Sequence, residues 1–594
     1  MDNFEDNCVE NHQKLIKQQP ESQSVEWFQI WSKYLSQNPY TRQEMNEKSV
    51  NIMQNVIAAT LQGNSCIDLT KEDIVLLNDL ALDEKQVSAQ SIAPFIYDQQ
   101  SLYLYRYWAL ENSLAQHIIR LVKQPVQTIS VEGSQQLFSD EYQQQALSTV
   151  IKNSLSIITG GPGTGKTYTL ARIIAVLNRN QSNLRIALAA PTGKAAQRMK
   201  EALQNSFNDP KLIDFISPEL KDIIPITIHR LLGLGHSVTP KFNEKQPLPY
   251  DLVVIDEASM LDLNLANMLF SAISDQTRLI LLGDAQQLAS VDVGNVLADL
   301  QSTEALAPNR MNLVKSRRFK DGAKIGEMAK FIQKEHNKNE VLAQFQQHIS
   351  TAGTLHEIAL KADMEDVVQL EFLPEEISAQ LDLSVYYDQL FLGFKDYVKS
   401  IHSFLDSTCS EESISGVIVA FDQYRILTAI RHSFFGLVTL NSQMEQRFLA
   451  LSQQLKQGDW YIGRPVMMTY NDYQLGLSNG DIGICLKRHL TQDAPFEVYF
   501  PSLEKWVLAN RLPKNIETAY VLTIHKSQGS EFKHTAVVLD QMALKLLSKE
   551  LIYTAITRAK SVVSLLVDPQ AFEQAITVAT VRKSGLFRKI DYIF

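Results

Sequence analysis

A glycine-rich segment between a strand-like run and a helix-like run most constrains what this chain can fold into. The segment GGPGTGKT (160–167) follows the apolar run LSIIT (155–159) and precedes TLARIIAVL (169–177). It matches the pattern G-x-x-x-x-G-K-[ST] in the strand–loop–helix setting that the pattern requires. Glycines let backbone N–H groups surround phosphate oxygens, and the helix adds the positive end of its dipole. The segment predicts a nucleoside triphosphate site, because a chance match in a surface loop would lack both neighbours.

The residues of this segment have separate expected roles. Lys166 would reach the β- and γ-phosphates of ATP, and Thr167 would ligate Mg²⁺. The other expected nucleotide contacts in the loop are Gly160, Gly161, Pro162, Gly163, Thr164 and Gly165. Upstream, Gln143 could read the adenine edge. The surrounding chain is rich in glutamine, so the residues alone support a plain surface role for Gln143 almost equally well.

Two consecutive acids, Asp256 and Glu257, follow the apolar run LVVI (252–255). At the carboxyl end of a buried strand, Asp256 would hold Mg²⁺, and Glu257 would orient and deprotonate the attacking water. The alternative is a surface acid pair that caps a strand or helix. The βαβ setting after Lys166 disfavours that alternative. A carboxylate at 257 favours hydrolysis over phosphate transfer to a small substrate.

Three further side chains are candidates for contact with the γ-phosphate. Gln287, in LLGDAQQL (281–288), can hydrogen-bond this phosphate and report its presence to neighbouring loops. Arg318, in SRRF (316–319), and Arg558, in YTAITRAK (553–560), can stabilise developing negative charge. One such arginine contributes about 10³–10⁵ in rate. Isolated arginines are more often surface residues, so each role is a hypothesis.

Short apolar runs alternate with helical stretches along most of the chain, which is typical of parallel α/β sheets. The expected strands are 155–159, 184–191, 251–256 and 278–284, then 416–420, 425–430, 520–524, 534–540 and 561–567. Residues 320–410 look helical and acidic. Residues 440–515 suggest short antiparallel strands joined by a tight Asn479–Gly480 turn. Residues 1–115 look mainly helical and end in two β-like runs around 98–100.

Composition excludes several classes of protein. With 594 residues, 45% hydrophobic and 21% charged, the chain is typical of a soluble protein of several domains. No apolar run reaches the roughly 18 residues of a membrane span, and the polar N-terminus does not look like a signal peptide. Four dispersed cysteines make zinc or disulfide sites improbable and indicate a cytoplasmic protein. A net charge of −10 argues against a broad basic DNA-binding face. The acids concentrate in residues 357–388, so the net charge does not exclude a local basic channel elsewhere in the chain.

The order and wording of the motifs resemble those of superfamily 1 helicases. The motifs are Gln143, GGPGTGKT, APTGKAA (190–196), VIDEAS (254–259), GDAQQL (283–288), SRRF, TIHKSQGSEF (523–532) and YTAITRAK. Within that superfamily, TIHRLLG (227–233) and the segments 426–441 and 463–483 resemble the RecD family, the alpha subunits of RecBCD enzymes (exodeoxyribonuclease V).

The resemblance implies two RecA-like parallel-sheet motor domains of the P-loop NTPase class, with ATP in the cleft between them. The implied domains are an N-terminal partner-docking domain (1–115), a first motor domain (116–345) and a second motor domain (346–594). The second would carry a small SH3-like β-barrel insert at about 440–515. Arg558 would reach across from the second motor domain, and Arg318 would lie near the domain junction.

The resemblance also implies contacts and partners. The implied DNA contacts, directed at phosphates and tolerant of sequence, are Thr192, Lys194, His229, Thr523, His525 and Lys526. The implied activity is 5′-to-3′ ATP-dependent DNA unwinding, with RecB-like and RecC-like subunits, on duplex ends and single strands during recombinational repair of double-strand breaks. Nuclease activity would belong to a partner.

Two alternatives stay open. One is a stand-alone superfamily 1 helicase acting on DNA or RNA; such RecD-like proteins carry a much longer N-terminal extension than the residues before this motor. The other is a non-catalytic subunit that binds ATP as a structural ligand. The presence of Lys166, Glu257, Gln287 and Arg558 disfavours this second alternative.

Overall fold

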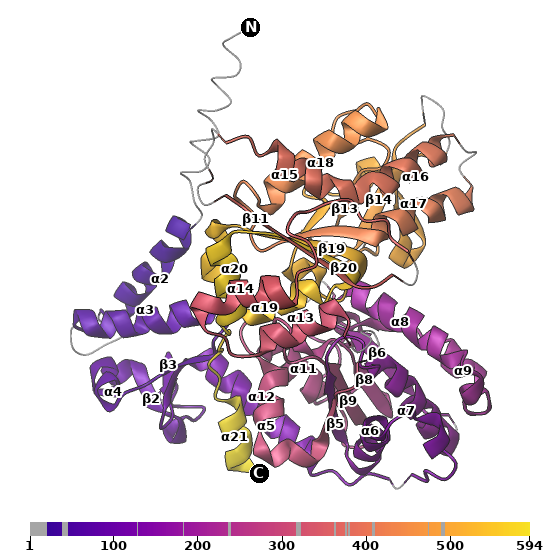
Figure 1. Ribbon diagram of the computed structural model, residues 1–594. Helices are drawn as coiled ribbons and strands as arrows, with labels where there is room; N and C mark the ends of the chain where they lie inside the picture. Colours follow the sequence, from indigo (N-terminus) through magenta and orange to yellow (C-terminus); the bar gives the residue numbers. More distant parts are fainter. Residues whose placement is uncertain are drawn as a thin grey trace.

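The computed structural model describes residues 21–37, 45–127, 129–181, 183–235, 239–316, 322–361, 364–374, 377, 381–406, 410–472, 474–488 and 494–594. Within these ranges the chain forms two parallel sheets flanked by helices, a small N-terminal sheet with its own helices, and an antiparallel sheet (Figure 1). The two parallel sheets confirm the predicted α/β class with two motor domains.

The first motor sheet has the strand order β10-β5-β9-β8-β6-β7, and all its pairings are parallel. Its strands are β5 (Leu155–Gly160), β6 (Ile186–Ala190), β7 (Ile226–Thr227), β8 (Leu252–Ile255), β9 (Arg278–Gly283) and β10 (Arg310–Leu313). Its main helices are α6 (Glu141–Lys152), α7 (Lys166–Asn180), α8 (Gly193–Phe207), α10 (Ile228–Leu231), α11 (Leu263–Ala272) and α12 (Val296–Ser302). β5, β6, β8 and β9 are buried at every position, as expected for strands covered on both faces.

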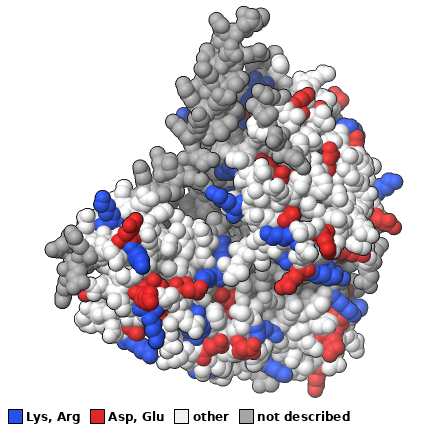
Figure 2. Space-filling model, turned by 60° about the vertical axis from the view of Figure 1, so that its left-hand side comes forward, with Lys and Arg blue, Asp and Glu red and all other residues white. Residues whose placement is uncertain are grey.

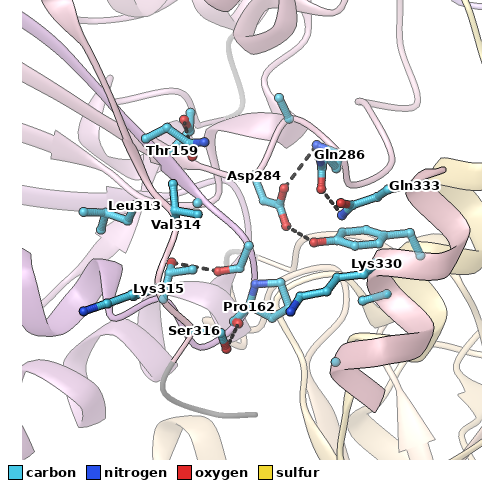
Figure 3. A pocket seen from close by; sticks show the side chains of 18 of the residues that line it. Thr159, Pro162, Asp284, Gln286, Leu313, Val314, Lys315, Ser316, Lys330 and Gln333 are labelled. Carbon is cyan, nitrogen blue, oxygen red and sulfur yellow. Dashed lines mark hydrogen bonds between the residues drawn. The ribbon is translucent and has the colours of Figure 1, made fainter. Parts of the chain in front are cut away.

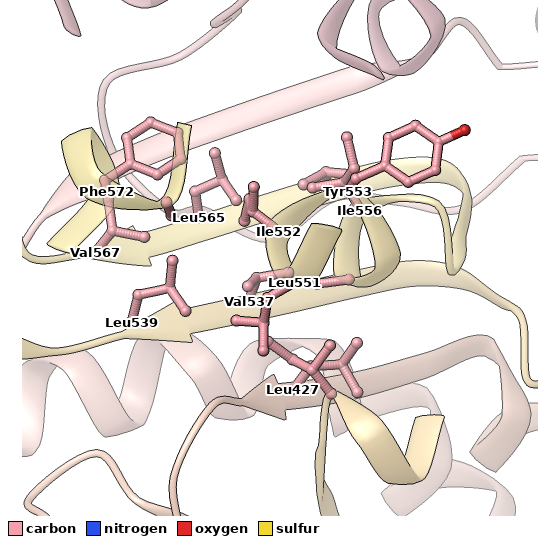
Figure 4. Packing of buried hydrophobic residues seen from close by; sticks show 14 of the residues in the cluster. Leu427, Val537, Leu539, Leu551, Ile552, Tyr553, Ile556, Leu565, Val567 and Phe572 are labelled. Carbon is pink, nitrogen blue, oxygen red and sulfur yellow. The ribbon is translucent and has the colours of Figure 1, made fainter. Parts of the chain in front are cut away.

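The second motor sheet has the order β11-β20-β19-β12-β18 and is also parallel. Its strands are β11 (Val367–Phe372), β12 (Tyr424–Thr428), β18 (Val521–Thr523), β19 (Phe532–Leu539) and β20 (Ala559–Val567). Its helices are α13 (Lys324–Gln333), α14 (Lys338–His348), α15 (Ser384–Phe391), α16 (Lys395–Leu405), α17 (Glu411–Gln423), α18 (Leu437–Ser452), α19 (Lys549–Ile556) and α20 (Pro569–Thr577). Side chains of α19 and α20 pack on β19 and β20 in one apolar cluster (Figure 4).

Two expectations for the second motor domain are wrong. The run 416–420, expected as a strand, lies inside α17. Ser410 caps this helix by accepting from the Ser413 amide, and Val417 and Phe421 form its buried face at i and i+4 spacing. Burial at that spacing overrides the β propensity of the valines and isoleucine. Conversely, β11 forms within 320–410, which was expected to be helical.

The antiparallel sheet has the order β16-β15-β14-β13-β17. Its strands are β13 (Pro465–Met467), β14 (Ile482–Leu486), β15 (Glu497–Phe500), β16 (Lys505–Leu508) and β17 (Glu517–Thr518). The antiparallel pairing is confirmed. The tight turn at Asn479–Gly480 also forms, because the Asp481 amide donates to the Ser478 carbonyl at 3.0 Å, but it does not by itself join two strands as a hairpin. β13 and β14 are joined by the long loop 468–481, which Gly480 closes by donating from its amide to the Met468 carbonyl. The likeness of this sheet to an SH3 barrel stays a prediction.

The N-terminal region combines helices with a small sheet of order β1-β4-β3-β2. Its elements are α2 (Glu21–Leu35), α3 (Glu47–Leu61), β1 (Cys66–Asp68), α4 (Lys71–Leu77), β2 (Ala81–Asp83), β3 (Phe95–Tyr97) and β4 (Ser101–Leu104). From β4 the chain runs directly into α5 (Tyr105–Val122), whose buried face joins the core of the first motor domain. The last helix, α21 (Leu586–Ile593), returns from the second motor domain to pack on α5.

The predicted domain boundaries fall inside helices, 115/116 within α5 and 345/346 within α14; the domain ranges stay predictions. Among the described helices, none is long and apolar enough to cross a membrane. On the face shown in Figure 2, Lys and Arg side chains are interspersed with Asp and Glu rather than gathered into one broad basic area.

Candidate nucleotide site and nucleic-acid groove

The loop after β5 has the backbone geometry of a phosphate cradle. Gly163 and Gly165 have φ values of 74° and 81°, in the left-handed region that glycine adopts without strain. At Gly160, a Cβ would lie 2.6 Å from Thr164 Oγ1 and 2.8 Å from the Leu313 carbonyl oxygen, so only glycine fits there. The loop therefore closes tightly against β10 and delivers the chain into α7 at Lys166.

Lys166 folds back over this loop. Its Nζ donates to the carbonyl oxygens of Gly160 at 2.6 Å and Gly161 at 3.3 Å. The ammonium group therefore stands beside the cradle, where it can neutralise the charge of bound phosphates.

Asp256 and Glu257 lie at the carboxyl end of β8, where the sequence predicts them. The Glu257 amide donates to Asp256 Oδ1 at 2.8 Å, and Glu257 itself has a φ of 52°. Burial, reinforced by the neighbouring charge of Glu257, raises the pKa of Asp256 to about 6, and Lys166 opposes this rise. Two adjacent, half-buried carboxylates beside a phosphate cradle favour a bound cation, because a cation offsets their mutual repulsion and the cost of desolvating their charge.

The next loop, 284–288 after β9, carries Gln287. Its Nε2 donates to Asp284 Oδ2 at 3.2 Å, and the same oxygen accepts from the Tyr553 hydroxyl at 3.2 Å. The other oxygen of Asp284 accepts from the Gln286 amide at 3.1 Å (Figure 3). Gln287 Oε1 is buried and has no hydrogen-bond partner within the described ranges. A buried amide with an unused acceptor oxygen beside the phosphate cradle can hydrogen-bond to a ligand.

Arg558 enters the site from the second motor domain. It is buried, with its Nε donating to the Thr554 carbonyl at 3.1 Å and its Nη1 to the Ser530 carbonyl at 3.3 Å. One cavity of about 290 Å³ is lined by residues of both motor domains, among them Lys166, Thr167, Asp256, Glu257, Gln287 and Arg558. The structure thus brings together most of the predicted catalytic set. Arg318 lies outside the described residues.

Gln143 is buried behind the phosphate loop, which contradicts the surface alternative. Its Oε1 accepts from the amide of Ser139 at 3.2 Å and from the Ser139 hydroxyl at 2.9 Å. Its Nε2 is 3.6 Å from where a Cβ on Gly165 would lie, and it has no partner among the described atoms. A buried amide with an unused donor fits recognition of a base edge.

The predicted DNA contacts differ in accessibility. His229 and Lys526 are exposed, and His525 is half-buried. Thr192 and Thr523 accept hydrogen bonds from local amides, those of Ala195 at 3.2 Å and Lys526 at 3.3 Å. These five side chains therefore lie in short turns or at helix starts rather than on one continuous helical face.

Lys194 lies between the motor domains and the antiparallel sheet. It lines a cavity of about 670 Å³ together with Asp422 and Asp481. Burial lowers the pKa of Lys194 to about 8, while the two acids favour its charge. Lys194 is half-buried, so its side chain reaches the cavity surface.

Comparison with known proteins adds an independent line of evidence. A family model described as an AAA domain matches residues 143–293, and one described as a UvrD-like helicase C-terminal domain matches residues 518–566. The RecBCD enzyme subunit RecD of Haemophilus influenzae is 34% identical over 557 residues, covering 85% of this chain and 82% of that protein. The chain belongs to the RecD family.

Two further similarities are more distant. The ATP-dependent RecD2 DNA helicase of Deinococcus radiodurans is 28% identical over 422 residues, which cover 71% of this chain and 48% of that protein. A crystal structure of Bacteroides Pif1 bound to single-stranded DNA is 15% identical and covers 77% of this chain and 96% of that chain, with a TM-score of 0.39.

Two residues of this RecD-family site were missed by sequence reasoning. Arg198 lines the nucleotide cavity and pairs with Glu531 of the second motor domain, Nη2 to Oε1, at 2.6 Å. Its position one helical turn after Lys194 on α8 was the available signal. Tyr553 was visible as the first residue of YTAITRAK, but only the folded structure brings its hydroxyl to Asp284.

Proposed function

We propose that this RecD-family chain is an ATP-dependent DNA helicase subunit of a RecBCD-type complex. The observation that carries the proposal is the cavity in which Lys166, Asp256, Glu257 and Gln287 of one motor domain face Arg558 of the other. A site built from two domains changes shape whenever the cleft opens or closes. ATP binding and hydrolysis can therefore drive relative movement of the domains.

The residues have the following proposed roles. Lys166 binds the β- and γ-phosphates, and Thr167 and Asp256 hold Mg²⁺, which when bound neutralises phosphate charge. Glu257 takes the proton of the attacking water. Gln287 and Arg558, with Arg318, stabilise the charge that develops on the γ-phosphate, and Gln143 binds the adenine edge.

The two motor domains would grip the strand alternately. The proposed contacts from the first are Thr192, Lys194 and His229, and those from the second are Thr523, His525 and Lys526. Movement in the 5′-to-3′ direction is proposed from family likeness. Nuclease activity is assigned to a partner, because Asp256 and Glu257 are already assigned to ATP hydrolysis.

The N-terminal region is the proposed docking surface for RecB-like or RecC-like subunits. On α2, Trp27, Ile30 and Tyr34 follow i, i+3 and i+7 spacing and are 48%, 67% and 57% exposed. Three large apolar side chains on one exposed helical face favour contact with another protein.

The test measures ATP turnover and strand displacement by the purified chain, with Lys166→Ala as the inactive control. We expect single-stranded DNA to stimulate hydrolysis in wild type, and duplexes with 5′ tails to be unwound in preference to those with 3′ tails. Hydrolysis no faster than in Lys166→Ala would favour the non-catalytic binding subunit. A preference for 3′ tails would overturn the proposed polarity while leaving the ATPase assignment intact.

A further inference from the structure

Tyr553 connects the second motor domain to the side chain that holds Gln287. It lies on α19 and is 3% exposed, and its hydroxyl donates to Asp284 Oδ2 at 3.2 Å. Gln287 Nε2 donates to that same oxygen, also at 3.2 Å. One carboxylate oxygen therefore accepts from a side chain of each motor domain.

The loop 284–288 has three other ties to the second motor domain. In one, Gln286 Oε1 accepts from Gln333 Nε2 of α13 (Figure 3), and the other two involve the backbone of Leu288. The Leu288 amide donates to Thr554 Oγ1 at 2.7 Å, and its carbonyl accepts from Gln528 Nε2 at 2.8 Å. These bonds fix the position of the loop. The Tyr553 bond differs because it reaches the carboxylate that sets the orientation of Gln287.

Tyr553 is placed to respond to movement of the second motor domain. Its neighbours on α19, Leu551 and Ile552, pack with Val537 and Leu565 of that domain's sheet, and in Figure 4 the Tyr553 hydroxyl points away from this packing. The hydroxyl also stands beside the phosphate loop, 3.2 Å from where a Cβ on Gly161 would lie. The ring therefore moves with its own domain while its hydroxyl contacts the other.

We propose that Tyr553 is a positioning residue that couples closure of the cleft to the orientation of Gln287. When α19 approaches the first motor domain, the Tyr553 hydroxyl and the Gln287 amide both donate to Asp284 Oδ2. The second donor weakens the hydrogen bond between that oxygen and Gln287. When α19 withdraws, Gln287 becomes the remaining side-chain donor to Oδ2 and is held more strongly on the carboxylate. This inference rests on the proposed ATPase function, because Gln287 matters only if a γ-phosphate occupies the cavity.

Burial strengthens the competition between Tyr553 and Gln287 for Asp284 Oδ2. Asp284 is 3% exposed, and burial raises the pKa of its carboxyl group. A buried carboxylate depends on each donor that it retains, since water does not replace a lost one. The other oxygen, Oδ1, accepts from the Gln286 amide at 3.1 Å, so the carboxylate cannot turn freely when Tyr553 leaves.

The test compares Tyr553→Phe with wild type in the full chain, measuring kcat and KM for ATP with and without oligo(dT). We expect strand-stimulated kcat to fall about tenfold, with KM and strand-free kcat changing less than about twofold. Tyr461→Phe is the matched control. It also removes a buried hydroxyl, bonded to that of Tyr520 at 3.2 Å within the second motor domain. The control should keep the wild-type stimulation ratio.

A double variant distinguishes positioning from general destabilisation. If Tyr553 acts through Gln287, Tyr553→Phe combined with Gln287→Ala should be no less active than Gln287→Ala alone. Multiplicative losses, or a wild-type stimulation ratio in Tyr553→Phe, would overturn the inference. Wild-type hydrolysis no faster than in Lys166→Ala would instead overturn the proposed function, and the inference with it.

Discussion

Lys526 donates a hydrogen bond of 2.6 Å to Asn479 Oδ1, so a lysine expected to bind DNA is held by the long loop of the antiparallel sheet. The same loop reaches the first motor domain, where a Cβ on Gly193 would lie 3.2 Å from Asp481 Oδ1. Asp481 also favours the charge of Lys194. The loop 468–481 thus lies against two segments of the proposed nucleic-acid groove, one from each motor domain.

Asn479→Ala should tighten binding of single-stranded DNA about twofold, and Asn479→Asp should weaken it. Lys526 must leave Asn479 before it can bind a phosphate, and both side chains are exposed, so the bond is worth only a few tenths of a kcal/mol. A carboxylate at 479 would instead hold Lys526 and repel phosphate. Anisotropy titrations of labelled oligo(dT) measure both effects. A change of the same sign in the two variants would contradict this interpretation of the loop.

Glu257→Gln should lower strand-stimulated kcat by about 10²–10⁴ while leaving ATP binding nearly unchanged. The amide preserves the size of the side chain in the cavity but cannot accept a proton. Single-turnover hydrolysis and fluorescent-nucleotide titration separate the two steps. Loss of nucleotide affinity equal to the loss of rate would show that Glu257 binds rather than acts as a base.

Asp256→Asn should stabilise the nucleotide-free chain at pH 7 and abolish hydrolysis. Burial raises the pKa of Asp256 to about 6, so its carboxyl group favours the folded state while protonated. That contribution is complete below about pH 4 and is lost as the pH rises through about 6. The neutral amide avoids this loss, so we expect Tm to rise by about 2 °C at pH 7 but not at pH 4. Thermal denaturation at the two pH values tests the sign.

Local patterns predicted the phosphate loop and the acids after β8, because strand, turn and helix N-terminus are neighbours in sequence. Asp256 and Glu257 lie at the carboxyl end of β8, where those patterns put them, whereas the patterns did not decide whether Gln143 is buried. The β11 strand and the α17 helix were mispredicted because tertiary burial decided between two conformations that both suit short apolar runs.

Contacts between distant segments could not be read from the sequence. Arg198 pairs with Glu531 across the cleft, and the turn at Asn479 meets Lys526 only after the antiparallel sheet has folded against the motor domains. No pattern of a few residues encodes such pairs, because their partners are separated along the chain by whole sheets.

A buried ion pair joins the end of the chain to the first motor domain. Lys589 Nζ on α21 lies 2.7 Å from Glu111 Oε2 on α5, and the two side chains are 8% and 0% exposed. Glu111 also accepts from the Ser584 hydroxyl at 3.0 Å and the Gly585 amide at 3.1 Å. Removing one partner would leave the other charge buried without its counterion.

Lys589→Met should therefore destabilise the chain by about 3–5 kcal/mol and release α21 to proteolysis. Lys583→Met is the matched control. Lys583 lies in the same C-terminal segment and pairs with Asp68, but these two side chains are 46% and 80% exposed. We expect its cost to be at most about 1 kcal/mol. Urea denaturation and limited proteolysis near the C-terminus measure the two variants. Equal, small effects would show that apolar packing of Leu586 and Ile590, rather than the buried pair, holds α21 on α5.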